Sequence, residues 1–214
     1  MQSIALIDYG SGNLRSAEKA LLKVSEGLTG ARQVAVTAEP DVVAAADAIV
    51  LPGVGAFAAC MAAVEAKPGL TAALDTAVRR RGVPYLGICV GMQLMATRGL
   101  EFGATPGFDW LSGEVRRIEP AGHQFKVPHM GWNGLLDLAE HPLFAGLAED
   151  TPVYFTHSFA FFPEREEDVI AMVDHGGRFP AAVARDNMAG VQFHPEKSQA
   201  AGLRLLANFL EWRP

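Results

Sequence analysis

The chain has 214 residues, 50% of them apolar, and a formal net charge of −6. This length and apolar fraction can bury one full core, so we expect a single domain over residues 1–214. The mildly acidic composition excludes the basic surface that nucleic-acid binding requires. No apolar run reaches the roughly 20 residues of a membrane span.

Cysteine usage and the N-terminal segment indicate a cytoplasmic protein. Cys60 and Cys89 are too few for a disulfide framework. The N-terminus lacks the basic segment and the long apolar run of a signal peptide. We therefore expect a cytoplasmic location and reduced thiols.

The first half of the chain alternates short apolar runs with amphipathic segments. The apolar runs predict strands at residues 3–7, 32–36, 48–51 and 84–88, and the segments between them predict helices at 14–24, 40–46, 57–65 and 70–81. This alternation predicts an α/β fold with an open, mostly parallel sheet flanked by helices. In such folds the active site lies beyond the carboxyl ends of the strands.

The loop after the first predicted strand contains Gly10 and Gly12, a spacing that also begins dinucleotide-binding loops. The third glycine of that fingerprint would fall at position 15, which Arg15 occupies. A turn that leads into the helix is therefore favoured over a phosphate-binding loop.

Cys89 lies where the fourth predicted strand meets a predicted helix at residues 90–97. Gly87 and Gly91 flank it two residues away on either side, which leaves room for the sharp turn of a nucleophile elbow. The helix N-terminus would also favour the thiolate. A buried structural cysteine in a glycine-rich turn is the alternative. Cys60 has neither flanking glycines nor a nearby base, and is interpreted as core packing.

A second loop, Pro52-Gly53-Val54-Gly55, follows the third predicted strand at the same edge of the sheet. Its glycines would allow a backbone N–H to turn outward and meet a developing negative charge. By itself, this loop is equally well explained as a plain turn.

Beyond residue 99 the predicted segments become shorter and richer in glycine and aromatic residues. Strands are predicted at residues 114–118, 124–127, 132–138, 153–155, 158–162, 169–173, 181–184 and 190–193. The first three fit a meander or hairpins, which predicts an antiparallel extension of the sheet. The segment from Val127 to Asn133 predicts a surface loop with Trp132 as a binding anchor, with a core tryptophan as the alternative. His157 could be a base, although a hydrogen-bonded, partly buried histidine is more common.

The last predicted strand ends in His194-Pro195-Glu196, ahead of a predicted helix that Ser198 caps. Residues two apart in an extended chain project to the same side, so Glu196 can orient the His194 imidazole. Neither C-x-x-C nor H-E-x-x-H occurs, which argues against a metal site. A cysteine, a paired histidine and a glycine loop at strand ends predict acyl transfer. They leave open whether the acyl donor is an amide, an ester or a thioester.

Two motifs resemble the class I, triad-type glutamine amidotransferases: Gly-Ile-Cys-Val-Gly-Met-Gln at residues 87–93 and Gly-Val-Gln-Phe-His-Pro-Glu at 190–196. Within that family, residues 8–14, 52–57, 127–133 and 197–199 resemble the glutaminase subunits of imidazole glycerol phosphate synthases. The chain departs from the family at Val90, where leucine is usual, and in an insertion-like segment at residues 25–33.

The resemblance implies a role for each matching residue. Cys89 would be the nucleophile, His194 the general base and then acid, and Glu196 the residue that orients His194. The oxyanion would be held by the backbone N–H of Val90 and by one from the loop formed by Gly53, Val54 and Gly55. The substrate would be glutamine, bound with the help of Gln93, His157 and Ser158. No cofactor is expected.

The resemblance also implies a partner. This would be a (β/α)8-barrel cyclase subunit that forms a heterodimer with this chain, receives ammonia through a channel and makes imidazole glycerol phosphate and aminoimidazole carboxamide ribotide in histidine biosynthesis. The docking surface would consist of Pro128, His129, Met130, Gly131, Trp132 and Asn133. The alternatives are a glutaminase subunit for another acceptor such as chorismate, and a non-catalytic scaffold subunit that has kept the fold.

Overall fold

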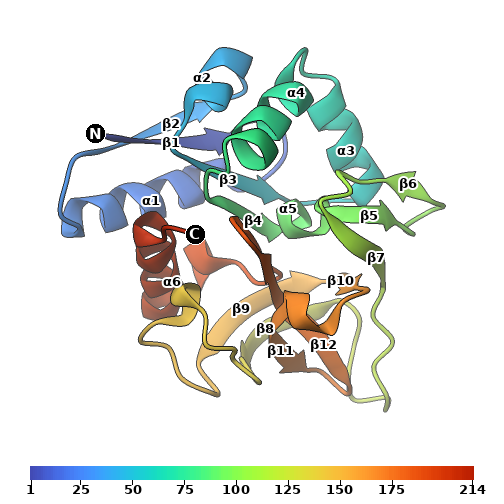
Figure 1. The fold of residues 1–214 in the computed structure, drawn as a ribbon. Coiled ribbons are helices and arrows are strands. Elements are labelled where there is room, and N and C mark those ends of the chain that lie inside the picture. Colours follow the sequence, from blue (N-terminus) through green and yellow to red (C-terminus); the bar gives the residue numbers. More distant parts are fainter.

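The computed structural model describes all of residues 1–214 and is built around a seven-stranded sheet (Figure 1). The strand order is β11-β12-β13-β4-β3-β1-β2. The bounds are β1 Gln2–Ile7, β2 Arg32–Thr37, β3 Ala48–Gly53, β4 Tyr85–Cys89, β11 Val169–Asp174, β12 Arg178–Arg185 and β13 Met188–Val191. The strands from β13 to β2 are parallel, while β11 and β12 extend the sheet antiparallel. The predicted α/β fold is confirmed.

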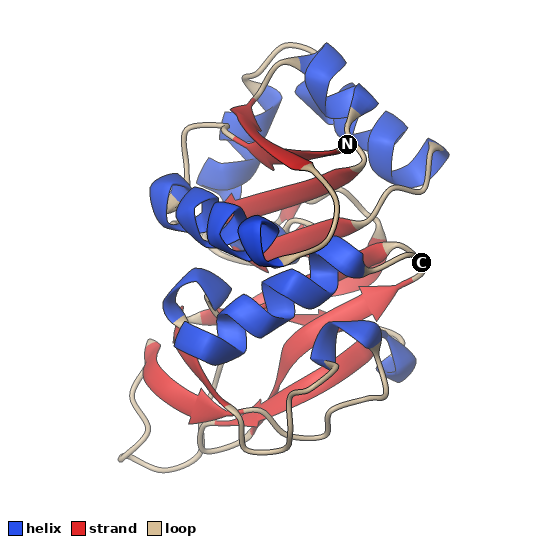
Figure 2. Ribbon diagram, turned by 90° about the vertical axis from the view of Figure 1, so that its left-hand side faces the viewer, coloured by secondary structure: helices blue, strands red, loops and turns tan.

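Helices cover both faces of the main sheet. On one face α1 (Leu14–Gly27) packs against α6 (Gln199–Glu211), and the other face carries α2 (Pro40–Ala45), α3 (Phe57–Glu65) and α4 (Leu70–Asp75), as Figure 2 shows from the side. In α1 the apolar positions recur on one side, and this side is the one that is buried. No helix combines the length and the apolar character needed to cross a membrane.

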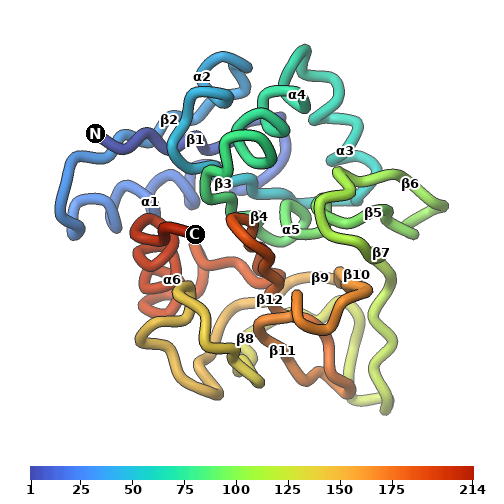
Figure 3. Tube along the Cα trace, in the orientation of Figure 1, coloured from blue at the N-terminus to red at the C-terminus, as the bar shows by residue number.

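Two smaller sheets lie between β4 and β11 in the chain. One has the order β10-β7-β5-β6, with β5 Ala96–Gly99, β6 Thr105–Pro106, β7 Leu111–Arg117 and β10 Phe159–Pro163, and the other pairs β8 His129–Gly134 with β9 Pro152–His157. The chain then re-enters the main sheet, and Figure 3 follows it back to β13 beside β4. Strand β4, which ends at Cys89, and strand β13, which precedes His194-Pro195-Glu196, are therefore neighbours although they lie far apart in the sequence.

Two predictions of local structure are wrong, for the helix at residues 90–97 and the strand at 124–127. The helix predicted at residues 90–97 is one turn, α5 (Val90–Gln93), because the N–H groups of Phe108 and Trp110 bind the carbonyls of Leu94 and Met95 at 2.8 and 2.9 Å. The helix predicted at 70–81 is present, with α4 covering residues 70–75 and a π-helical turn, η1 (Thr76–Arg80), continuing it. The strand predicted at 124–127 does not form.

The prediction of a surface loop at residues 127–133 is also wrong, because residues 129–134 form strand β8. This strand pairs antiparallel with β9, with His129 opposite His157 and Trp132 opposite Tyr154. The insertion-like segment at residues 25–33 comprises the end of α1, which stops at Gly27, the turn that follows and the first residues of β2.

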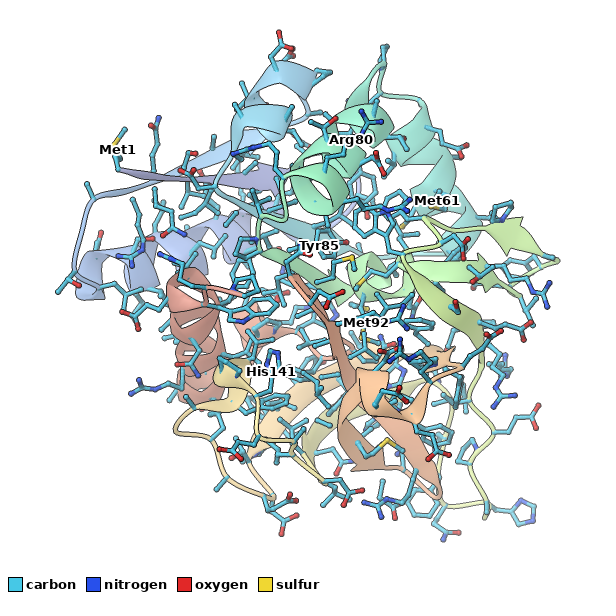
Figure 4. All side chains as sticks on the ribbon, viewed as in Figure 1. Met1, Met61, Arg80, Tyr85, Met92 and His141 are labelled. Carbon is cyan, nitrogen blue, oxygen red and sulfur yellow. The ribbon has the colours of Figure 1, made fainter.

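The core continues beneath the strand ends that carry the motifs. Tyr85 is fully buried, donates a hydrogen bond from its hydroxyl to the Gly91 carbonyl at 2.9 Å, and meets Trp110 edge to face at 5.0 Å. Figure 4 places Tyr85 and Met92 near the middle of the molecule and Met1 at its edge. The turn at Cys89 therefore rests on rigid packing.

Candidate active site

The predicted elbow at Cys89 is present. Cys89 has φ 55° and ψ −111°, a conformation that costs energy for a residue with a side chain. A Cβ atom on Gly87 would stand 2.5 Å from the Gly91 carbonyl oxygen, and one on Gly91 would stand 1.8 Å from the Leu51 oxygen. Both glycines are thus required for close backbone approach, while the cysteine itself carries the strain.

His194 lies at the end of the neighbouring strand and is paired with Glu196. The two side chains, 2% and 3% exposed, are joined by His194 Nδ1 and Glu196 Oε1 at 2.9 Å. A carboxylate can only accept this bond, so Nδ1 carries the proton and Nε2 is the ring atom left for a partner other than Glu196. His194 Nε2 is buried and makes no hydrogen bond within the chain. The pair has the geometry predicted for it.

Strand β9 fixes the backbone of the base. The His194 N–H donates to the Tyr154 carbonyl at 2.9 Å, and the Ser198 hydroxyl donates to the His194 carbonyl at 2.7 Å. The same hydroxyl accepts from the Tyr154 N–H at 3.0 Å. Ser198 was predicted to cap α6, but its side chain makes no cap bond and serves the His194 segment instead.

The site favours a charged His194. Burial alone would lower its pKa, but the interactions with Cys89 and Glu196 outweigh burial and raise the pKa to about 9. His157 differs, because burial lowers its pKa to about 4. Its two ring nitrogens are occupied by His129 Nδ1 at 3.1 Å and the Phe159 carbonyl at 3.0 Å. His157 is therefore a neutral, satisfied histidine and does not act as a base.

A cavity of about 290 Å³ opens in front of Cys89 and His194. Such a volume suits a single small metabolite. The lining residues are Val54, Gly55, Cys89, Val90, Gln93, Glu101, Pro128, Thr156, His157, Ser158, Phe159 and His194. Eight of the ten residues predicted for catalysis, the oxyanion hole and substrate binding line this cavity. The other two, Gly53 and Glu196, are not among the lining residues. No group of three or more His, Cys, Asp and Glu side chains is arranged to hold a metal.

Glu101 and Thr156 line the cavity but were not predicted. Glu101 comes from a glycine-containing loop with no motif, and its Oε2 accepts the Phe57 N–H at the start of α3 at 2.9 Å. Thr156 precedes His157 on β9. The sequence gives no signal for either, because only the packing of distant strands brings them to the pocket.

The glycine loop, residues 52–55, begins beside Cys89, because Gly53 is opposite Cys89 in the β3–β4 register. The Val54 carbonyl accepts from the Ser11 hydroxyl at 2.6 Å and from the Cys60 thiol at 3.4 Å. The two ends of a peptide unit point in opposite directions, so the Gly55 N–H is directed away from these donors. It donates to no group of the chain.

Strand β8 carries two exposed apolar side chains, Met130 and Trp132, which are 64% and 48% exposed. The Trp132 ring meets Tyr154 edge to face at 6.0 Å, and Lys197 Nζ lies 5.6 Å from the Tyr154 ring centre. This surface therefore adjoins the triad. His129, predicted to be part of a surface loop, is instead 3% exposed because its side chain points inward from β8.

Comparison with known proteins identifies the family. Residues 5–212 match the family model of class-I glutamine amidotransferases. The chain is 58% identical over 214 residues to the imidazole glycerol phosphate synthase subunit HisH of Caulobacter vibrioides, covering 100% of both chains. It is 54% identical over 210 residues to the HisH subunit of Ruegeria pomeroyi, covering 98% of this chain and 99% of that one.

Solved structures agree at the level of the fold. A crystal structure described as glutamine amidotransferase superposes with a TM-score of 0.70 at 19% identity, over 97% of each chain. A glutamine amidotransferase from Thermotoga maritima gives a TM-score of 0.60 at 15% identity, over 91% of this chain and 76% of that one. With its elbow cysteine and its paired histidine, the chain belongs to the class-I glutamine amidotransferases and, within them, to the imidazole glycerol phosphate synthase HisH subunits.

Proposed function

We propose that this chain hydrolyses glutamine to glutamate and ammonia. The ammonia passes to a cyclase subunit that makes imidazole glycerol phosphate and aminoimidazole carboxamide ribotide in histidine biosynthesis. The observation that carries this proposal is the cavity in which Cys89 faces His194, in a chain with full-length HisH relatives. Residues 1–214 act as one glutaminase domain, and the reaction takes place in the cytoplasm.

The first half of the reaction forms a thioester. The Cys89 thiolate attacks the side-chain amide carbon of glutamine, and the electron pair of the C=O bond moves to oxygen. The Val90 N–H and an N–H of the Gly53-Val54-Gly55 loop hold this oxyanion, and the Gly55 N–H has no competing partner. His194 Nε2 then gives its proton to the departing nitrogen, so ammonia leaves as the C–N bond breaks.

The second half releases glutamate. His194, now neutral, takes a proton from water, and the resulting hydroxide attacks the thioester carbon. The C–S bond breaks, and Cys89 returns as the thiolate beside a protonated His194. Glu196 stabilises this charged imidazole in both halves through the bond to Nδ1. Gln93 and Ser158 line the pocket and are assigned to hold the glutamine.

The partner is a (β/α)8-barrel cyclase that docks on β8 and its flanks, with Trp132 as the anchor. The support for this is the exposure of Met130 and Trp132 beside the active-site segment that carries Lys197. Aromatic residues that are half exposed in the free chain often dominate interfaces. Ammonia released in bulk water would be protonated, so delivery requires the two active sites to be joined.

A direct assay tests the function. Glutamate release from glutamine is measured for the chain alone, with a cyclase, and with the cyclase and its ribotide ligand. We expect the cyclase and its ligand to stimulate release. Absence of stimulation by a cyclase that binds the chain would refute the assignment to this pathway, and absence of any glutamate release would refute the glutaminase.

Trp132→Ala tests the docking surface. Loss of a central aromatic anchor typically costs about 2 kcal/mol or more of binding free energy, or roughly 30-fold in Kd. The matched control is Leu22→Ala on α1, which removes a side chain that is 43% exposed, similar to the 48% of Trp132. Equal cyclase affinity for the two variants, measured by calorimetry, would remove Trp132 from the interface.

A further inference from the structure

Two buried histidines beneath β8 are bonded to each other. His129 is 3% exposed and His157 is 6% exposed, and His129 Nδ1 lies 3.1 Å from His157 Nε2. The His129 ring also stacks on Phe155 and His175, with centroids at 4.7 and 4.1 Å. A bond between two imidazoles requires one nitrogen to donate and the other to accept, so the tautomers of the two rings are linked.

The inner end of this chain of bonds fixes its direction. His157 Nδ1 lies 3.0 Å from the Phe159 carbonyl, which can only accept, so Nδ1 carries the proton. Burial lowers the pKa of His157 to about 4 and that of His129 to about 3, so both rings are neutral at pH 7. His157 Nε2 is therefore an acceptor, and His129 Nδ1–H donates to it.

The outer end gives the same direction independently. Asn133 Oδ1 accepts the Gly134 N–H at 2.9 Å, and Asn133 Nδ2 donates to the Asp174 carbonyl at 2.7 Å, which fixes the orientation of the amide. The second hydrogen of Nδ2 faces His129 Nε2 at 3.2 Å. Each donor thus meets an acceptor, and any reversal would place two donors or two lone pairs face to face.

The same Phe159 carbonyl connects the histidines to the nucleophile. It accepts a second bond from Gln93 Nε2 at 2.9 Å, and Gln93 Nε2 also donates to Gln192 Oε1 at 3.0 Å. Gln192 Nε2 in turn donates to Cys89 Sγ at 3.6 Å. Both N–H bonds of Gln93 are occupied, so the atom that this residue has free for a ligand in the cavity is the carbonyl oxygen Oε1.

We propose that Asn133, His129 and His157 form a one-way hydrogen-bond relay from the docking strand β8 to the glutamine pocket. The relay positions the two glutamine side chains beside the nucleophile, and it makes their geometry sensitive to what binds next to Trp132, the residue before Asn133. The inference rests on the proposed function, since it concerns how partner docking reaches the glutaminase site. The three relay members are positioning residues, and none of them exchanges a proton with the reacting atoms.

His129→Phe tests the relay because it keeps a ring between Phe155 and His175 but removes both nitrogens. In the complex with cyclase and its ligand, we expect kcat/KM for glutamine to fall by between about 2-fold and 30-fold. Synthesis from added ammonia should stay at the wild-type rate, because it bypasses the pocket. His129→Asn places an amide N–H near the position of Nδ1, and should recover part of the loss.

The matched control is His175→Phe. This change is chemically the same and alters the ring stacked on His129, but His175 Nε2 bonds only to the Lys126 carbonyl at 2.8 Å. We expect wild-type kcat/KM for this variant. Equal activity of the His129→Phe and His175→Phe complexes would overturn the relay, whereas failure of the wild-type complex to hydrolyse glutamine would overturn the proposed function itself.

A measurement on the wild-type chain covers the case in which His129→Phe does not fold. Imidazole ¹⁵N chemical shifts at pH 7 should show both His129 and His157 as neutral rings protonated at Nδ1. An Nε2–H tautomer or a doubly protonated ring at either position would contradict the relay, whatever the variants do.

Discussion

The two walls of the glutamine pocket are built differently. The triad wall comes from β4 and the end of β13, neighbours inside the main sheet, and its Cys89 and His194 are only 4% and 1% exposed. The opposite wall is the loop at residues 53–55, in which Val54 is 42% exposed. The Val54 carbonyl is tied to the rest of the chain by the Ser11 hydroxyl and the Cys60 thiol.

Because of this difference, Cys89 and His194 are held in fixed positions, whereas the loop at residues 53–55 can change its conformation. Interior strands open only with global unfolding, whereas an exposed loop held by few bonds can change its conformation at low cost. On the proposed function, the nucleophile Cys89 and the base His194 are therefore held in place by the sheet itself. On the proposed function, this loop carries oxyanion donors, and its conformation is easier to change than that of the triad.

Cys89→Ala removes the nucleophile from the triad wall and should have the largest effect on glutamine-dependent turnover. Without the thiolate no thioester forms, so glutamine-dependent turnover should fall by at least about 10⁴-fold. The complex should still use added ammonia at the wild-type rate, which serves as the internal control. Residual glutamine turnover above about one part in a hundred would show that another group is the nucleophile.

Glu196→Gln weakens the same wall without removing its reactive atoms. The amide cannot stabilise a charged imidazole as the carboxylate does, and it can offer a donor to His194 Nδ1 and so select the wrong tautomer. We expect a decrease of about 10²-fold to 10⁴-fold in the rate of glutamate release in a single turnover. Glu196→Asp keeps the charge and should lose less. Equal losses in the two variants would indicate that packing, rather than charge, is the function of this side chain.

Alkaline pH should reduce glutamate release reversibly, because it removes the proton from His194. The pKa of His194 is raised from 6.5 to about 9 by Cys89 and Glu196, against the opposing effect of burial. The stabilising charge is fully present below pH 6.5 and is lost as the pH rises through about 9. Glutamate release should therefore decline above about pH 9, by roughly tenfold per unit, because the leaving ammonia is no longer protonated.

The Glu196→Gln variant sharpens this test, because removal of the carboxylate should move the alkaline limb to lower pH. A limb at the same pH in both proteins would show that a group other than His194 titrates there. His157 does not interfere, since burial keeps its pKa at about 4.

The sequence predicts the geometry around Cys89 and His194 well, but it does not predict the relay or the length of α5. The reason is that the first depends on residues close in sequence, whereas the others depend on pairing between distant strands. Two glycines around Cys89 and the i, i+2 spacing of His194 and Glu196 are local patterns whose geometry follows from the elbow and from extended chain. The relay depends on the antiparallel register that places His129 opposite His157, which residue types alone do not set. The short α5 has the same origin, because strand pairing beyond it overrides helical propensity.

Ser11→Ala loosens the loop wall and should give the smallest effect. The Ser11 hydroxyl holds the Val54 carbonyl at 2.6 Å, so its loss frees the Val54–Gly55 peptide to rotate, and on the proposed function the Gly55 N–H is then less often available to the oxyanion. One such bond is worth about 0.5–1.5 kcal/mol, so kcat for glutamine should fall by about 2-fold to 10-fold. Ser11→Thr keeps the hydroxyl and should stay closer to the wild type. Because Cys89 and His194 are untouched, alkylating agents, which form a thioether with the cysteine and need no oxyanion donor, should label Cys89 in Ser11→Ala as fast as in the wild type. Slower labelling would mean that the two walls are mechanically coupled and that the nucleophile is not set independently of the loop.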